Sequence, residues 1–157
     1  MTVRLEKWAA GDLPLLTALL GDPAMTEHLG GPESPEKLAE RQARYEKPET
    51  QMFKIVDDEP VGSVGYWERG DDAYEVGWSV LPAHQGHGYA TAGMRLLLDR
   101  IRDEGDRRYV HAYPSVENVA SNALCRTLGF TLRGPQEFEY PKGHFMQCND
   151  WQLDLGV

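Results

Sequence analysis

The chain has 157 residues, of which 41% are hydrophobic and 26% charged, and its formal net charge is -9. This is the balance of a folded protein rather than a disordered one, and the length suits one domain spanning residues 1–157. The acidic balance argues against nucleic acid as a partner, because a phosphate-binding protein needs a basic face. It fits a basic small molecule or an amine-bearing peptide better.

The first half of the chain predicts a strand, two helices and a run of strands. Alternating apolar residues indicate a strand over Val3 to Trp8. We expect Asp12 to cap a helix that turns its leucines inward, with one short helical turn near Met25 before Ser34 starts a second helix. The expected strands that follow are Gln51 to Val56 and Pro60 to Trp67, which form a hairpin, and Asp71 to Val80.

The second half alternates helices with strands. From Tyr89 the hydrophobic period changes to that of a helix, which Gly105 ends. A further helix has Asn118 as its expected N-cap and Gly129 as its C-terminal glycine cap, with Phe130 making the accompanying apolar contact. The remaining expected strands are Arg108 to Tyr113, Phe130 to about Glu139, and His144 to about Leu155, the last two meeting at the turn YPKG.

No apolar run is long enough to span a bilayer, and the N-terminal MTVRLEKWAAGD lacks the apolar core of a signal peptide. The two cysteines, Cys125 and Cys148, and the histidines show no spacing typical of structural zinc. We therefore expect a cytoplasmic protein with no metal site and no membrane partner. The sequence leaves the oligomeric state open, and a homodimer is compatible with it.

A glycine-rich stretch, HQGHGYATAG, lies where the third strand gives way to a helix. A helix leaves its first N–H groups unpaired, and glycines let a phosphate approach them closely. The alternative is a plain tight turn. Tyr89 and Ala90 stand where a P-loop needs Lys and then Ser or Thr. A dinucleotide-binding fingerprint fits poorly, because the strand before the turn is expected to be antiparallel.

Two segments carry a resemblance to a known family. QGHGYA, from Gln85 to Ala90, resembles the Gln/Arg-x-x-Gly-x-Gly/Ala signature of the GNAT superfamily of acyl-CoA N-acyltransferases. NVASNALCRTLGF, from Asn118 to Phe130, resembles a helix of the branch that includes the ribosomal-protein N-terminal acetyltransferases. The order of strands and helices agrees over nearly the whole chain. The resemblance implies an α/β fold: a mixed, mostly antiparallel sheet flanked by helices, with the strands EVGWSV and YVHAYP splayed apart.

The resemblance also implies a co-substrate, acetyl-CoA, and the residues that hold it. The glycine-rich loop would cradle the coenzyme A diphosphate, mostly through main-chain N–H groups, and the backbone of the preceding strand would pair with the pantetheine arm. Asn118 matches a position that contacts the cofactor. The residues implied for binding are Trp78, Ser79, Val80, Gln85, Gly86, His87, Gly88, Tyr89, Ala90 and Asn118.

The chemistry needs a base for the acceptor amine and an acid for the leaving thiolate. Glu75, in the strand before the glycine-rich loop, is the expected base; the alternative is an exposed strand residue on a solvated face. Many members of the superfamily place a tyrosine acid where this chain has Cys125. In the branch named above a serine takes that task, and Ser121 holds its place; the alternative is a serine that only helps to cap the helix.

The expected activity is therefore acetyl transfer from acetyl-CoA to a primary amine, on a small molecule or a peptide N-terminus, in a ternary complex. The alternative from another class is a non-catalytic acyl-CoA sensor that keeps the phosphate cradle and has lost turnover.

Overall fold

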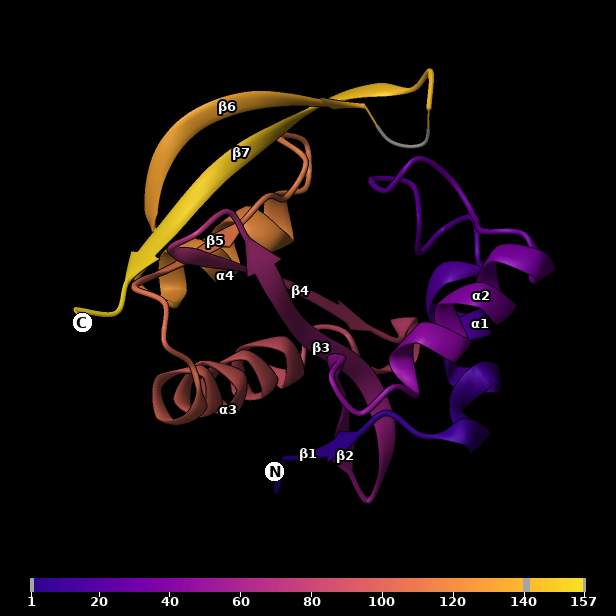
Figure 1. The fold of residues 1–157 in the computed structure, drawn as a ribbon. Helices are drawn as coiled ribbons and strands as arrows, with labels where there is room; N and C mark the ends of the chain where they lie inside the picture. The colour runs from indigo at the N-terminus through magenta and orange to yellow at the C-terminus, as the bar shows by residue number, and fades with distance from the viewer. Residues whose placement is uncertain (1, 140–141, 157) are drawn as a thin grey trace.

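The computed structural model describes residues 2–139 and 142–156, which form a sheet of seven strands in the order β1-β2-β3-β4-β5-β7-β6 (Figure 1). Neighbouring strands are antiparallel except β4 and β5, which are parallel. Tyr140 and Pro141, in the expected last turn, lie outside the described residues. The strands are β1 (Arg4–Lys7), β2 (Gln51–Asp57), β3 (Glu59–Arg69), β4 (Ala73–Val80), β5 (Tyr109–Ala112), β6 (Thr131–Glu139) and β7 (Phe145–Asp154).

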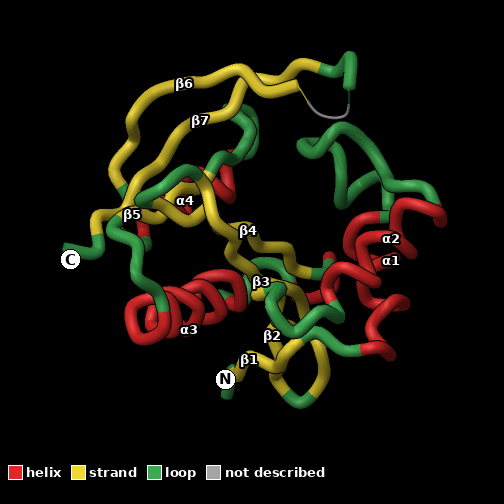
Figure 2. Tube along the Cα trace, viewed as in Figure 1, coloured by secondary structure: helices red, strands yellow, loops and turns green. Residues whose placement is uncertain are grey.

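Helices cover both faces of this sheet, as the resemblance implies (Figure 2). The helix α3 (Tyr89–Glu104) places its apolar stripe on the main core, and α4 (Val119–Thr127) lies beside it. The helices α1 (Leu13–Leu20) and α2 (Pro35–Tyr45) enclose a second cluster around Trp8 and Met52. The buried stripe of α3 consists of Gly93, Met94, Leu97, Leu98 and Ile101.

The strands β4 and β5 part after a short run of pairing, which confirms the expected splay. Their pairing begins at Ala73 with Tyr109 and ends at Glu75 with His111. The strand β4 continues to Val80 and stays paired with β3 along its whole length. The far half of β4 therefore presents an open backbone edge on its β5 side.

The helix ends show which of the expected caps form. Ser34 accepts a hydrogen bond from Lys37 N, as an N-cap does. Gly129, at φ 88°, ends α4, and Phe130 N donates to the Cys125 carbonyl in a Schellman motif. Asp12 stands at the N-cap of α1 as expected, but its side chain makes no cap hydrogen bond to that helix: its carboxylate accepts from Ala9 N, three residues upstream, and caps the 3₁₀ turn before α1.

Between α1 and α2 the chain forms turns, and the expected helical turn near Met25 is not a helix. Thr26, only 1% exposed, anchors this segment: its hydroxyl donates to the Asp22 carbonyl at 2.8 Å, and Leu29 N donates to its carbonyl. No helix among the described residues is long and apolar enough to cross a membrane.

Candidate active site

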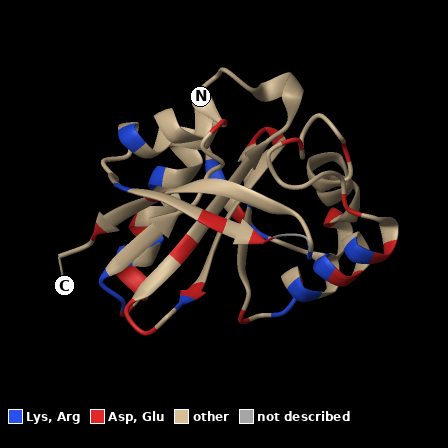
Figure 3. Cartoon of the chain, turned by 90° about the horizontal axis from the view of Figure 1, so that it is seen from above, with Lys and Arg blue, Asp and Glu red and all other residues tan. Residues whose placement is uncertain are grey.

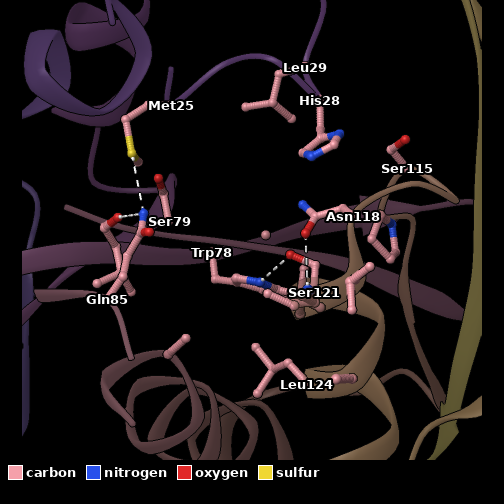
Figure 4. Close-up of a pocket in the computed structure, with 18 of the residues that line it drawn as sticks. Met25, His28, Leu29, Trp78, Ser79, Gln85, Ser115, Asn118, Ser121 and Leu124 are labelled. Atoms are coloured by element: carbon pink, nitrogen blue, oxygen red, sulfur yellow. Dashed lines mark hydrogen bonds between the residues drawn. The ribbon is translucent and has the colours of Figure 1, made fainter. Parts of the chain in front are cut away.

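A cavity of about 950 Å³ opens where β4 and β5 part. Its walls come from the turns before α2, the far half of β4, the start of α3, the chain after β5 and the first turns of α4 (Figure 4). All of the expected site residues line it except His87, whose ring is exposed and whose Nδ1 lies 3.2 Å from the His84 carbonyl. The fold thus brings together residues from distant parts of the chain.

The start of α3 forms one end of the cavity. Gly86 and Gly88 adopt φ values of 78° and 83°, in the left-handed region that favours glycine, and Gly88 is the N-cap. The first-turn N–H groups have no acceptor within the helix, and they carry the positive end of the helix dipole. Among the described residues that line the cavity there is no Lys or Arg. An anion bound at this end of the cavity would therefore have to be held by main-chain N–H groups.

Hydrogen bonds of two side chains, Tyr89 and Gln85, hold this loop in place. The Tyr89 hydroxyl donates to Asp57 Oδ2 at 2.6 Å, which ties the start of α3 to the turn between β2 and β3. This hydrogen bond raises the pKa of Tyr89 and lowers the pKa of Asp57. Gln85 Nε2 donates to the Val80 carbonyl at 3.0 Å and lies 3.5 Å from Met25 Sδ. The loop is therefore joined to β4 and to the turns before α2.

The open edge of β4 offers backbone groups to the cavity. The Val80 carbonyl lies on this edge, since it accepts from Gln85. Successive strand residues direct their backbone groups to opposite sides, so Trp78 also faces the open edge. Ser79 lines the cavity, but its backbone is directed towards its β3 partner, Ser63. Of the three residues expected to pair with a pantetheine arm, Trp78 and Val80 are placed to do so.

Glu75 lies at the last paired position of β4, beside the opening. Its side chain is 21% exposed, and Arg69 Nη1 donates to its Oε1 at 2.9 Å. Burial raises the pKa of Glu75 above the usual range, although the Arg69 guanidinium opposes the shift. A carboxylate that is both buried and of raised pKa is the kind of group that serves as a base near neutral pH.

Arg69 was not singled out by the sequence. Its guanidinium lies 4.3 Å from the ring centre of Tyr113 and 5.5 Å from that of Phe138. Tyr113 also lines the cavity, and burial raises its pKa. One arginine thus links the β6–β7 arm, the chain after β5 and the Glu75 carboxylate. No local pattern reveals the whole arrangement, because Tyr113 and Phe138 lie far from Arg69 in the sequence.

A second polar group on the same sheet face lies next to Glu75. His111 Nδ1 is 2.6 Å from Asp150 Oδ1, and the Gln152 amide nitrogen is 3.3 Å from His111 Nε2. Arg133 donates to the Gln152 carbonyl oxygen, so the amide NH₂ donates to the imidazole. The contact between His111 and Asp150 joins β5 to β7 beside the opening.

The first turn of α4 forms the opposite wall (Figure 4). Asn118 Oδ1 accepts from Ser121 N at 3.1 Å, which confirms Asn118 as the N-cap. The Ser121 hydroxyl oxygen accepts from Trp78 Nε1 at 3.2 Å, a contact that the sequence did not indicate. Cys125 is 0% exposed within the main core, and burial raises its pKa to about 12. Ser121, not Cys125, reaches the cavity.

Charged groups are spread over the molecule rather than gathered in one basic face (Figure 3). Glutamates contribute three of the residues that line the cavity, Glu27, Glu75 and Glu117. In the described ranges, no group of three His, Cys, Asp or Glu side chains is placed to hold a metal ion.

Comparison with known proteins decides the family. The sequence over residues 2–131 matches the GNAT acetyltransferase domain. The chain belongs to the GNAT acetyltransferase family. This membership agrees with the splayed strands and with the glycine-rich start of α3. The search of curated proteins found no match to this sequence.

Solved structures share the GNAT fold over the length of the chain. A GNAT acetyltransferase from Bacillus anthracis is similar with a TM-score of 0.85 at 17% identity, over 100% of this chain and 97% of that one. An acetyltransferase from Salmonella typhimurium, which modifies the N-terminal serine of ribosomal protein L7/L12, has a TM-score of 0.82 at 23% identity. The match covers 98% of this chain and 95% of that one. The protein yncA from Salmonella typhimurium, solved with its cofactor acetyl-CoA, has a TM-score of 0.81 at 20% identity. The match covers 100% of this chain and 96% of that one.

Proposed function

We propose that residues 1–157 form one acetyltransferase domain that moves an acetyl group from acetyl-CoA directly to a primary amine, with both substrates bound together. One observation carries the proposal. The cavity between β4 and β5 has the glycine-rich start of α3, with its free N–H groups, at one end and a partly buried carboxylate, Glu75, beside the opening. These are the two features that a direct transfer from a diphosphate-bearing thioester to an amine needs.

Acetyl-CoA is the co-substrate. Main-chain N–H groups from Gln85 to Ala90, on either side of the Gly88 N-cap, bind its diphosphate without a basic side chain. The open backbone of Trp78 and Val80 pairs with the amide groups of its pantetheine arm. Asn118 contributes from the start of α4. The thioester then lies in the gap between β4 and β5, where both sheet faces can be reached.

Glu75 acts as the base. It accepts a proton from the acceptor ammonium, directly or through a water, and its raised pKa suits this transfer near neutral pH. Arg69 Nη1 donates to one carboxylate oxygen, Oε1, and so holds the carboxylate beside the opening. Ser121 acts as the proton donor to the leaving sulfur, since it is the first-turn hydroxyl of α4 that lines the gap.

The acceptor is an amine on a small molecule or at a peptide N-terminus. The similar Salmonella typhimurium enzyme that modifies the N-terminal serine of L7/L12 supports the peptide. The cavity is lined by Glu27, Glu75 and Glu117 with no Lys or Arg among its described residues, which suits an ammonium group in either case.

Two observations favour the alternative, a non-catalytic acyl-CoA sensor. Glu75 is ion-paired with Arg69, and the tyrosine acid of many GNAT members is replaced by the buried Cys125. A sensor would bind acetyl-CoA at the same α3 cradle and release no thiol.

The proposal is tested by following free thiol after mixing the protein with acetyl-CoA and a panel of amines. The panel contains short peptides with free N-termini, their N-acetylated counterparts as controls, and di- and polyamines. Thiol release that depends on a free amine supports the enzyme. Tight binding of acetyl-CoA with no thiol release above the amine-free background, for every amine, would favour the sensor.

A further inference from the structure

The side chain of Trp78 reaches from the open segment of β4 to the first turn of α4. Its indole N–H donates to the Ser121 hydroxyl oxygen at 3.2 Å, and these two residues are brought together only by the fold (Figure 4). Both residues line the cavity. The backbone of Trp78 faces the gap while its ring packs against the main core, so the indole is held in place.

This hydrogen bond determines where the serine proton can point. A hydroxyl has one proton and two acceptor lone pairs, and the indole N–H is a donor only. The indole therefore fills one lone pair of Ser121 Oγ and repels the hydroxyl proton. The Ser121 backbone N–H is already bound to Asn118 Oδ1, which fixes the residue in the first turn. The hydroxyl proton is directed away from the indole.

The same turn is a favourable place for negative charge. The helix α4 has nine residues, and its first turn carries the positive end of its dipole. Val119, at the first helical position, is 81% exposed, so this end of the helix is open to the cavity. A sulfur that gains charge beside Ser121 is stabilised both by the hydroxyl proton and by the helix end.

We propose that Trp78 is a positioning residue that turns the Ser121 hydroxyl towards the leaving sulfur. This inference rests on the proposed function, since it takes Ser121 as the proton donor. The amine nitrogen bonds to the acetyl carbon, the C–S bond breaks, and the electron pair remains on sulfur. The Ser121 proton passes to the sulfur, and the Ser121 oxygen takes a proton from a water. Glu75 receives the proton that the amine nitrogen loses and returns it to the hydroxide that this water leaves. The net change is one proton moved from nitrogen to sulfur.

The test is a double-mutant cycle on the full chain with Trp78→Phe, Ser121→Ala and both together. Phenylalanine keeps an aromatic ring and removes the N–H. If Trp78 acts through Ser121, each single change lowers kcat by about three- to tenfold, the range of one hydrogen bond, and the double variant is no slower than Ser121→Ala. The affinity for CoA stays within about twofold of the unmodified protein.

Trp151→Phe is the matched control. Trp151 Nε1 donates to Asn122 Oδ1 at 2.8 Å, so this change also removes an indole hydrogen bond to α4. Trp151 and Asn122 are not among the residues that line the cavity. The control is expected to lower the free energy of unfolding while kcat stays near that of the unmodified protein.

A second readout needs no acceptor. With CoA bound, the ultraviolet absorbance of the thiolate is followed during a pH titration. A hydroxyl that donates to the sulfur lowers the thiol pKa, so Trp78→Phe and Ser121→Ala raise it by the same amount and Trp151→Phe leaves it unchanged. The titratable groups that line the cavity are the same in all variants and cancel in the comparison: Glu27, His28, Glu75, His84, Tyr89, Tyr113 and Glu117.

The outcomes separate the two proposals. Two results would overturn the role of Trp78 and leave acetyl transfer intact. One is that the effects of Trp78→Phe and Ser121→Ala on kcat add fully; the other is that the thiol pKa in Trp78→Phe equals that in the Trp151→Phe control. If the unmodified protein binds CoA but acetylates no amine, and the thiol pKa still rises equally in Trp78→Phe and Ser121→Ala, the positioning role of Trp78 stands and the transferase is contradicted. Failure of the unmodified protein to bind CoA would contradict both.

Discussion

Arg69 donates to the Glu75 carboxylate at 2.9 Å, and yet the pKa of Glu75 is raised, because burial outweighs the ion pair. The two residues lie on neighbouring strands, where β3 ends and β4 begins. The guanidinium is held in turn by the rings of Tyr113 and Phe138. This arrangement fixes one oxygen of the carboxylate. Desolvation raises the pKa of Glu75, and Arg69 is the largest of the opposing contributions, with smaller ones from Trp67 and His111.

Glu75→Gln removes the base and keeps the size of the side chain. We expect kcat to fall by at least about tenfold, equivalent to roughly 1.4 kcal/mol of barrier, with the dissociation constant for CoA unchanged. Steady-state kinetics and calorimetric titration measure the two quantities. Glu104→Gln, on the exposed side of α3, is the control and leaves both unchanged. An unaltered kcat in Glu75→Gln would remove the residue from the mechanism.

Arg69→Met tests the balance that sets the Glu75 pKa. Loss of the guanidinium removes the largest contribution that opposes desolvation, so the pKa of Glu75 rises further. The base works only when ionised, and therefore the acidic limb of the kcat/KM profile moves to higher pH. The control is Arg100→Met, which removes an arginine from the ring of Phe53 away from the cavity and leaves the limb in place. A limb that moves to lower pH contradicts the assignment.

Gly86→Ala tests the cradle at the start of α3. Gly86 has φ 78° and a Cβ there meets nothing within 4 Å, so the cost of alanine is backbone strain of about 1–2 kcal/mol. Gly70→Ala is matched, with φ 64° and the same open space, between β3 and β4. Both variants are expected to be less stable in denaturant titrations. Only Gly86→Ala should weaken CoA binding; equal affinities in the two would show that this loop does not contact the cofactor.

The two cysteines are both buried, and burial raises the pKa of Cys125 to about 12. We expect neither to react with a disulfide reagent in the folded protein at neutral pH, and both to react after unfolding, as read by absorbance. Rapid modification of Cys125 in the native state would contradict its place in the core.

Much of the fold follows from local patterns. The caps at Ser34 and Gly129 are set by groups within a few residues of the helix ends, so a short window of sequence contains both partners. Asp12 shows where such reasoning fails. The Asp12 carboxylate accepts from Ala9 N and pairs with the distant Lys54, and it makes no hydrogen bond to the N–H groups at the start of α1. Tertiary contacts decided between these partners.

The candidate site divides in the same way. The glycine-rich loop and the Asn118 cap are contiguous motifs, and the sequence places them at helix starts that the structure confirms. The partners of the two expected catalytic side chains are not contiguous. Arg69 reaches Glu75 across a strand pair, and Trp78 reaches Ser121 across the gap, so only the three-dimensional arrangement reveals them.

The most direct measurement compares the dissociation constants of CoA and of pantetheine, which lacks the diphosphate together with the adenosine 3′-phosphate that it carries, by calorimetric titration. If main-chain N–H groups at the start of α3 hold the diphosphate, two charge-assisted hydrogen bonds of about 1.5 kcal/mol each make CoA bind at least about a hundredfold more tightly. Similar dissociation constants for the two ligands would contradict the account.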